Sequence, residues 1–241
     1  MSGDAREAVL GRVRRALGRD GPLTGEALSA VERRLAEPRP NLIPARGQLD
    51  PEGRIKLFTE QAEAVTTEVW RLSRYAELPE ALADYLRAHN LPARVAMAPD
   101  PLLDRAGWGA TDGGRAPLEV RRGTATADDE VGVTTAFAGV AETGTVMLVS
   151  GPDNPAMLAF LPETCVVVLP AGRVVGAYEE GWRRLREAYG AAPPRAVTFV
   201  TGPSRTADIE QTLQLGAHGP RRLLVLIVDE DAGRGGRLPV A

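Results

Sequence analysis

Three short segments in the second half of the chain carry the side chains best suited to chemistry. The first, Ala141-Glu-Thr-Gly-Thr145, sets a carboxylate beside two hydroxyls and a glycine. Glycine lets the backbone approach a ligand closely, and a carboxylate shielded from water can act as a base or a nucleophile. We therefore predict that Glu142 is catalytic. The ligand-binding residues predicted here are Thr143, Gly144 and Thr145. The alternative is a β-turn with Glu142 in solvent and Gly144 at positive φ.

The second segment is Thr201-Gly-Pro-Ser-Arg-Thr-Ala-Asp-Ile-Glu210, in which a strand and a Gly-Pro break precede a predicted helix start. A helix N-terminus presents free amides, and hydroxyls there cap the helix or contact a ligand. Its two acidic residues already satisfy the helix dipole and would repel a phosphate unless Arg205 intervened. A hydroxylated or amide ligand, or an ionic latch within the protein, therefore fits better. The predicted site residues are catalytic Asp208 and ligand-binding Gly202, Ser204, Thr206 and Glu210. The alternative is a well-capped helix without a ligand.

The third segment, Gly216-Ala-His-Gly-Pro220, is a tight turn before the last predicted strand. His218 could serve as a general acid or base near neutral pH, and Gly219 is predicted to bind a ligand. The alternative is a hydrogen-bonded structural histidine. Ligands of open α/β sheets bind beyond the carboxyl ends of the strands, so we expect the three segments to converge on one crevice there.

Strands and helices alternate along the main body, and they must position these segments. The predicted strands are 65–71, 93–98, 131–136, 144–149, 164–169, 196–201 and 222–228. The predicted helices are 50–64, 79–90, 178–189 and 206–215. The last strand is apolar throughout, as expected when helices cover both faces of a sheet. The pattern predicts an α/β fold, a three-layer α/β/α sandwich with a largely parallel sheet, over residues 46–232.

Residues 1–45 are predicted to form a helical arm. Apolar positions recur at helical spacing over 4–19 and 24–37, among many charged residues, and a proline-rich break follows at 38–44. The arm is too short and too polar to hold a core of its own. We expect it to pack on the main body or on a neighbouring subunit, in a homo-oligomer. Residues 233–241 are predicted to be a tail.

Composition excludes several classes of function. The net charge of −3 and the absence of a long apolar run predict a cytoplasmic protein without a membrane span or a nucleic-acid partner. One cysteine and two histidines leave no disulfide, no thiolate zinc site and no iron–sulfur cluster held by this chain alone. Cys165, in an apolar run, is predicted to be a buried and inert thiol. With neither a P-loop nor a Rossmann glycine motif, we expect no metal and no cofactor in this chain.

Taken together, the three segments resemble the signature of the lactate-utilization protein C family, the LUD-domain (formerly DUF162) proteins. The resemblance covers roughly residues 50–230 and is strongest over 131–228. It implies a fold like that of sugar-phosphate isomerases and coenzyme A transferases. In one respect the chain departs from the pattern: relatives often carry an acidic residue before the Glu-Thr-Gly turn, where this chain has Thr135-Ala-Phe137.

The resemblance also implies a function in the oxidation of L-lactate to pyruvate. The chain would be an accessory subunit whose partners are iron–sulfur and cysteine-rich subunits, with a small organic acid as a further ligand. The alternative is a stand-alone enzyme or binding protein for a coenzyme A thioester or a phosphorylated small molecule, because Glu142-Thr-Gly resembles the Glu-x-Gly at the nucleophile of coenzyme A transferases. A non-catalytic sensor of carbohydrates or nucleotides is a third option.

Overall fold

The computed structural model of the chain describes residues 3–19, 21–108, 118–190, 192–206, 214–215 and 219–230. The chain falls into two units, Met1–Leu42 and Ile43–Ala241.

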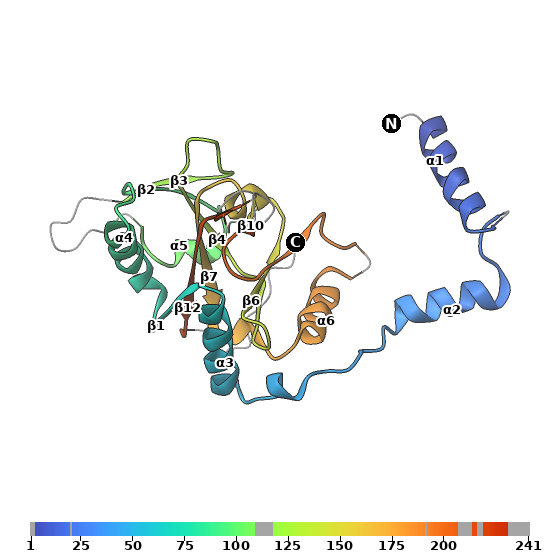
Figure 1. Cartoon of the computed structure of the whole chain (residues 1–241), viewed down its shortest axis with the longest axis horizontal. Helices are drawn as coiled ribbons and strands as arrows, with labels where there is room; N and C mark the ends of the chain where they lie inside the picture. Colours follow the sequence, from blue (N-terminus) through green and yellow to red (C-terminus); the bar gives the residue numbers. More distant parts are fainter. Residues whose placement is uncertain are drawn as a thin grey trace. The chain divides into compact units, whose positions relative to one another are not determined.

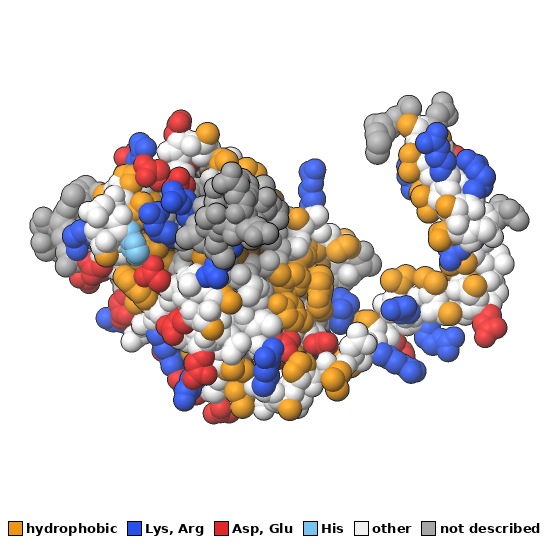
Figure 2. All heavy atoms as spheres, in the orientation of Figure 1, with side chains coloured by type: hydrophobic (Ala, Val, Ile, Leu, Met, Phe, Trp, Pro, Cys, Tyr) orange, Lys and Arg blue, Asp and Glu red, His pale blue; other side chains and the backbone are white. Residues whose placement is uncertain are grey.

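The first unit consists of α1 (Gly3–Ala16) and α2 (Gly25–Ala36), which confirms the two predicted helices. Thr24 is the N-cap residue of α2, although its side chain makes no capping hydrogen bond. Apolar side chains run along one side of each helix (Figure 2), and α2 buries none of its residues. Packing of the arm on a neighbouring subunit stays a prediction.

In the second unit, helices flank a six-stranded sheet and a four-stranded sheet (Figure 1). Its α-helices are α3 (Pro51–Ala64), α4 (Leu78–Ala88), α5 (Pro101–Asp104) and α6 (Tyr178–Tyr189), and its 3₁₀ turns are η1 (Ala45–Gly47), η2 (Tyr75–Glu77), η3 (Ala156–Ala159) and η4 (Ala171–Arg173). The predicted start of α3 is confirmed, because Asp50 accepts a hydrogen bond from Gly53 N (3.1 Å) and Pro51 occupies the first turn. Within the described residues, no helix is both long and apolar enough to cross a membrane.

The central sheet has six strands in the order β1-β12-β7-β4-β2-β3, and every pairing in it is parallel. Its strands are β1 (Glu68–Leu72), β2 (Arg94–Met97), β3 (Glu119–Arg122), β4 (Val131–Thr135), β7 (Thr164–Pro170) and β12 (Arg222–Val228). Strand β7 is buried over its whole length. Both its faces are covered, which explains why its sequence is apolar without alternation.

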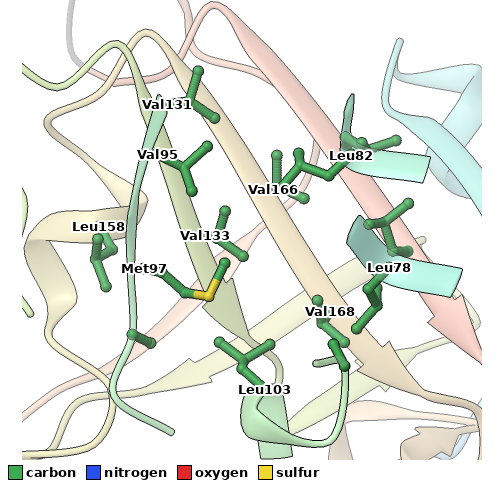
Figure 3. Packing of buried hydrophobic residues seen from close by; sticks show 14 of the residues in the cluster. Leu78, Leu82, Val95, Met97, Leu103, Val131, Val133, Leu158, Val166 and Val168 are labelled. Carbon is green, nitrogen blue, oxygen red and sulfur yellow. The ribbon is translucent and has the colours of Figure 1, made fainter. Parts of the chain in front are cut away.

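The two faces of the central sheet pack against different elements. Val166 and Val168 of β7 face α4, whose Leu78 and Leu82 lie over them (Figure 3). The odd-numbered residues of β7 lie in a second core cluster together with the helix α3, including Phe58. The mixed α/β architecture with a parallel sheet flanked by helices is therefore as predicted.

A second, four-stranded sheet lies on the α3 side, in the order β8-β5-β6-β9. Its strands are β5 (Ala138–Val140), β6 (Thr145–Val149), β8 (Val174–Val175) and β9 (Val197–Val200). One face of β6 packs toward the central sheet, and the other face packs under α6. This sheet is not apparent from the sequence, because β6 is buried on both faces and so resembles a strand of the central sheet.

The predicted helix 206–215 is wrong at both of its described ends. Thr206 belongs to β10 (Arg205–Thr206) and Gln214 to β11 (Gln214–Leu215), and these two strands pair antiparallel. The pairing of β10 with β11 satisfies the backbone hydrogen-bonding groups of both strands. This tertiary pairing outweighs the local helical periodicity of the sequence.

Candidate functional site

Glu142 lies in the tight turn between β5 and β6, and it is buried, with 3% of its surface exposed. Its carboxylate oxygen Oε1 accepts a hydrogen bond from Tyr178 N (3.1 Å), at the first residue of α6. Its own backbone N–H donates to Gly176 O (3.1 Å). Glu142 therefore holds the start of α6 to the second sheet, and the alternative of a solvent-exposed Glu142 is wrong.

Gly144 allows this turn to approach the backbone of α3. Its φ of +63° confirms the positive φ expected for the turn, and a Cβ built there would lie 2.2 Å from Ala62 N. Only glycine fits this position without a shift of the helix or of the turn.

Four hydroxyl groups form a cluster next to the turn. Thr145 Oγ1 lies 2.7 Å from Thr143 Oγ1, 2.7 Å from Thr201 Oγ1 and 3.0 Å from the hydroxyl of Tyr178. Thr145 is fully buried. The cluster therefore links the first predicted segment to the beginning of the second through direct side-chain contacts.

The second and third predicted segments line a cavity of about 450 Å³. Thr201, Gly202 and Ser204 border it from one side, and Gly219 and the following residue border it from the other. Ser204 N donates to Pro220 O (2.8 Å), which joins the two segments. Three of the predicted ligand-binding residues, Gly202, Ser204 and Gly219, thus face one cavity.

The residues that line this cavity place it at the amino edge of the central sheet, whereas the site was expected at the carboxyl edge. Cys165 and Leu223, the second residues of β7 and β12, both line it. The large cavity therefore lies beside the amino ends of these parallel strands, because the segments that form it precede β12 rather than follow a strand of the central sheet.

Arg205 is the charged side chain among the residues that line the large cavity. Its Nη2 donates to Val65 O (3.1 Å) and also contacts the hydroxyl of Thr66, just after the end of α3. This anchoring keeps a positive charge at the cavity wall. The cavity could therefore hold a ligand with hydroxyl groups and one anionic group.

The remaining predicted residues are placed as follows. Asp208, Glu210 and His218 lie outside the described residues. For Thr206 the structure gives the backbone, which belongs to β10. Glu142, Thr143, Gly144 and Thr145 are not among the residues that line the large cavity. Convergence of all these residues on one crevice stays a prediction.

Cys165 is buried, as predicted. Burial raises the pKa of its thiol to about 12, so the thiol is protonated at neutral pH and is a poor nucleophile although it borders the large cavity. Within the described part of the chain, His, Cys, Asp and Glu form no cluster of three or more that could hold a metal ion.

A much smaller cavity of about 10 Å³ adjoins the large one. The two share Ala159, Phe160 and Thr198, and the small one extends to Ser150 and Asn154.

Two residues of the hydroxyl cluster, Tyr178 and Thr201, were not predicted to be site residues. The spacing of Tyr178 with Trp182, Leu185 and Tyr189 indicates the apolar face of a helix, which hides the role of its hydroxyl. The signal for Thr201 is its position directly before the Gly-Pro break, at the end of a strand.

We expect Glu142→Ala to lower the free energy of unfolding by about 1–3 kcal/mol, because the amide of Tyr178 then loses its buried acceptor. Glu142→Gln keeps an acceptor oxygen and should lose less than half of that. Urea unfolding of both variants measures the difference. Equal losses in the two variants would show that the negative charge, rather than the hydrogen bond, stabilises the turn.

Comparisons with known proteins show which family the chain resembles over most of its length. The LUD-domain family model matches residues 55–228. The lactate utilization protein C of Anoxybacillus flavithermus is 28% identical over 236 residues, covering 93% of this chain and 99% of that protein. The protein of the same name from Halalkalibacterium halodurans is 27% identical over 190 residues, covering 73% of this chain and 79% of that protein.

A solved structure also shares the fold. The crystal structure of a DUF162 family protein from Deinococcus radiodurans matches with a TM-score of 0.57 and 22% sequence identity. The match covers 75% of this chain and 99% of that one.

Proposed function

This chain belongs to the LUD-domain family, and on that premise we propose that it serves lactate utilization as a cytoplasmic accessory subunit of an iron–sulfur system that oxidises L-lactate to pyruvate. The observation that carries the proposal is the match to a lactate utilization protein C over 93% of this chain and 99% of that relative. The oxidation releases two electrons and two protons. The iron–sulfur clusters of the partner subunits would accept the electrons, and the protons would pass to solvent.

The cysteine content of the chain supports an accessory role. A cluster is usually held by four thiolates, and this chain supplies one thiol, which is buried and protonated at neutral pH. The clusters therefore belong to other subunits, and this chain would bind those partners, a small organic acid, or both.

The large cavity favours the second candidate function, a binding protein or enzyme for a phosphorylated small molecule or a coenzyme A thioester. Its volume of about 450 Å³ suits a small-molecule ligand, and Arg205 supplies a cation for a phosphate. The hydrogen bond from Tyr178 N engages Oε1 of Glu142, so nucleophilic attack on a thioester would have to come from its other oxygen, Oε2.

Reconstitution with purified subunits tests the accessory role. The isolated chain should be colourless and should not oxidise L-lactate, whereas adding it to the iron–sulfur partner subunits should raise their lactate oxidation several-fold. Glu142→Gln and Asp208→Asn should weaken that activity. Glu60→Gln is the matched control, because Glu60 lies exposed on α3 and, within the described residues, forms an ion pair only with Lys56, at 3.9 Å.

Two outcomes would contradict the proposal. A flavin spectrum or lactate turnover by the isolated chain would show that it is an oxidase in its own right. Full activity of the partner subunits without this chain would remove its role in the oxidation.

A further inference from the structure

Strand β9 forms one edge of the four-stranded sheet, because it pairs with β6 alone. All of its residues are partly exposed, whereas β5 and β6 are buried throughout. An edge strand presents a row of backbone N–H and C=O groups that have no strand to pair with. The outer side of β9 is therefore able to pair with a further extended segment.

The register of β6 and β9 identifies the open backbone groups. Ser150 N donates to Ala196 O (3.0 Å), so Ala196 and every second residue after it point their backbone groups toward β6. Met147, the register partner of Phe199, accepts a hydrogen bond from the β5 side instead (2.9 Å). The N–H and C=O groups of Val197 and Phe199 therefore point away from β6, and within the described residues they have no hydrogen-bond partner.

The large cavity runs along this open edge. The residues of β9 that line it are consecutive: Thr198, Phe199 and Val200, followed by Thr201. Neighbouring residues of a strand point to opposite faces of a sheet, so a cavity that touches all of them lies beside the edge of the strand rather than on one face. The large cavity thus has an unpaired strand as one of its walls.

Apolar side chains flank the edge on both faces of the sheet. Phe160, with 41% of its surface exposed, lines the large cavity together with residues of the central sheet. Trp182 of α6 is 39% exposed, and its ring centroid lies 5.4 Å from that of Phe199. A strand added to β9 would direct alternate side chains to these two sides. Apolar residues in that strand would shield Phe160 and Trp182 from water.

The charges around β9 select the kind of partner. The strand itself, Val-Thr-Phe-Val, has no charged residue, but Arg195 precedes it and Arg205 follows it. Both arginines are exposed, and neither forms an ion pair within the described residues. The contacts of Arg205 to the end of α3 use Nη2 alone, so its Nε and Nη1 can donate to a ligand. A partner strand with an acidic residue at each end satisfies both arginines.

A second copy of this chain does not fit these charges. Two copies that pair antiparallel about Phe199 would form a symmetric edge contact. This pairing sets Arg195 of one copy opposite Pro203 of the other, two residues from the other copy's Arg205. The same repulsion recurs at the other end, and like charges this close destabilise a strand pair. An acidic segment of a different protein replaces the repulsion by attraction.

We propose that the open edge of β9 receives an extended, acidic segment of a partner protein, which adds a fifth strand to the four-stranded sheet. The backbone of Val197 and Phe199 supplies the hydrogen bonds, and Phe160 and Trp182 contact alternate side chains of the added strand. The identification of the partner as another subunit of the same system rests on the proposed function. The strand addition itself rests on the register, the exposure and the charges of β9.

Peptide binding to the full chain alone tests the proposal, by isothermal titration. The probe is a short synthetic peptide of alternating valine and threonine with a glutamate at each end. It should bind, and the same peptide with a lysine at each end should bind several-fold more weakly. N-methylation of the probe's backbone amides should abolish binding, because it removes the donors that pair with β9. Equal binding of the N-methylated peptide would show that no strand is added and would overturn the proposal.

A proline in β9 tests the edge from the side of the protein. Val197→Pro removes an outward N–H and leaves the pairing with β6 in place, because an edge strand tolerates proline where its N–H faces solvent. It should lower the affinity for the glutamate-ended probe by roughly tenfold, since one hydrogen bond is lost and the ring occupies the edge. Val197→Ala is the matched control, which keeps the N–H and should keep the affinity. Unchanged affinity in Val197→Pro would contradict docking at this edge.

Arg195→Glu keeps the test decisive if Val197→Pro does not fold. This variant should weaken binding of the glutamate-ended probe and strengthen binding of the lysine-ended probe, each by a few-fold. Arg87→Glu is the matched control: Arg87 is also exposed, but it lies on α4, on the other face of the central sheet. Binding of both probes that is the same in Arg195→Glu as in the unmodified chain would remove charge from the selection of the partner.

Sedimentation of the isolated chain tests the remaining occupant. A dimer that Val197→Pro dissociates and Val197→Ala does not would show that a second copy occupies the edge, and would overturn the assignment to a partner protein. The peptide measurements need no other subunit. Failure of the reconstituted oxidation and failure of peptide docking are therefore separate results.

Discussion

Gly144→Ala should lower the free energy of unfolding of the α/β unit by about 2–5 kcal/mol. A side chain at a φ of +63° costs roughly 1–2 kcal/mol. The added methyl group would lie 2.2 Å from Ala62 N, and overpacking of this kind adds about 1–3 kcal/mol. Such a loss is a large part of the stability of an ordinary domain. Urea unfolding followed by circular dichroism measures it.

Gly107→Ala separates the two contributions. Gly107 has a φ of +65°, close to that of Gly144, but a Cβ there would meet nothing within 4 Å. Its replacement should therefore cost only the backbone strain. If the two variants lose the same stability, the close approach of the turn to α3 contributes nothing, and the account of Gly144 given above is wrong.

Phe58→Ala should cost about 3–5 kcal/mol, the usual loss for a fully buried aromatic side chain. Phe58 is fully buried on α3, in the core cluster between this helix and the odd-numbered face of β7. Its ring also lies beside Gly139 of β5, where a Cβ would come within 3.1 Å of it. The residue thus packs one helix against both sheets, and its truncation should destabilise the unit as a whole.

Lys56→Ala is the matched control for this change. Lys56 lies on the same helix with 79% of its side chain exposed, so its replacement should change stability by no more than about 0.5 kcal/mol. Thermal and urea unfolding of both variants would reveal the contrast. A loss below about 1 kcal/mol in Phe58→Ala would mean that the core relaxes into the space left by the ring.

The sequence predicts those parts of the structure that depend on local pattern. Asp50 and Pro51 mark the start of α3, and the uninterrupted apolar run of β12 indicates a strand covered on both faces. Gly202 and Gly219, chosen because they adjoin polar residues in tight turns, do line the large cavity. In each of these cases a few neighbouring residues determine the outcome.

The sequence does not predict what depends on pairing between distant segments. The second sheet forms because β6 pairs with β9, about 50 residues further along the chain. Arg173 and Asp100 belong to no motif, and they line one cavity because β7 and β2 end at the same edge of the sheet. Helical periodicity over 206–215 was misleading, because its described ends pair as strands.

Strand β7 lies between the large cavity and a cavity of about 180 Å³ that Thr135, Asp100 and Arg173 line at the carboxyl edge of the central sheet. The strand Thr164–Pro170 spans roughly 20 Å at about 3.3 Å per residue, with Cys165 at the large cavity and Arg173 just beyond its other end. The small cavity of about 10 Å³ shares Ala159, Phe160 and Thr198 with the large one, and it shares Asn154 with the cavity at the carboxyl edge. That volume is about the minimum that a single water molecule needs. The small cavity is therefore too small to let an organic molecule pass, so a ligand held in either of the other two cavities must enter and leave through bulk solvent.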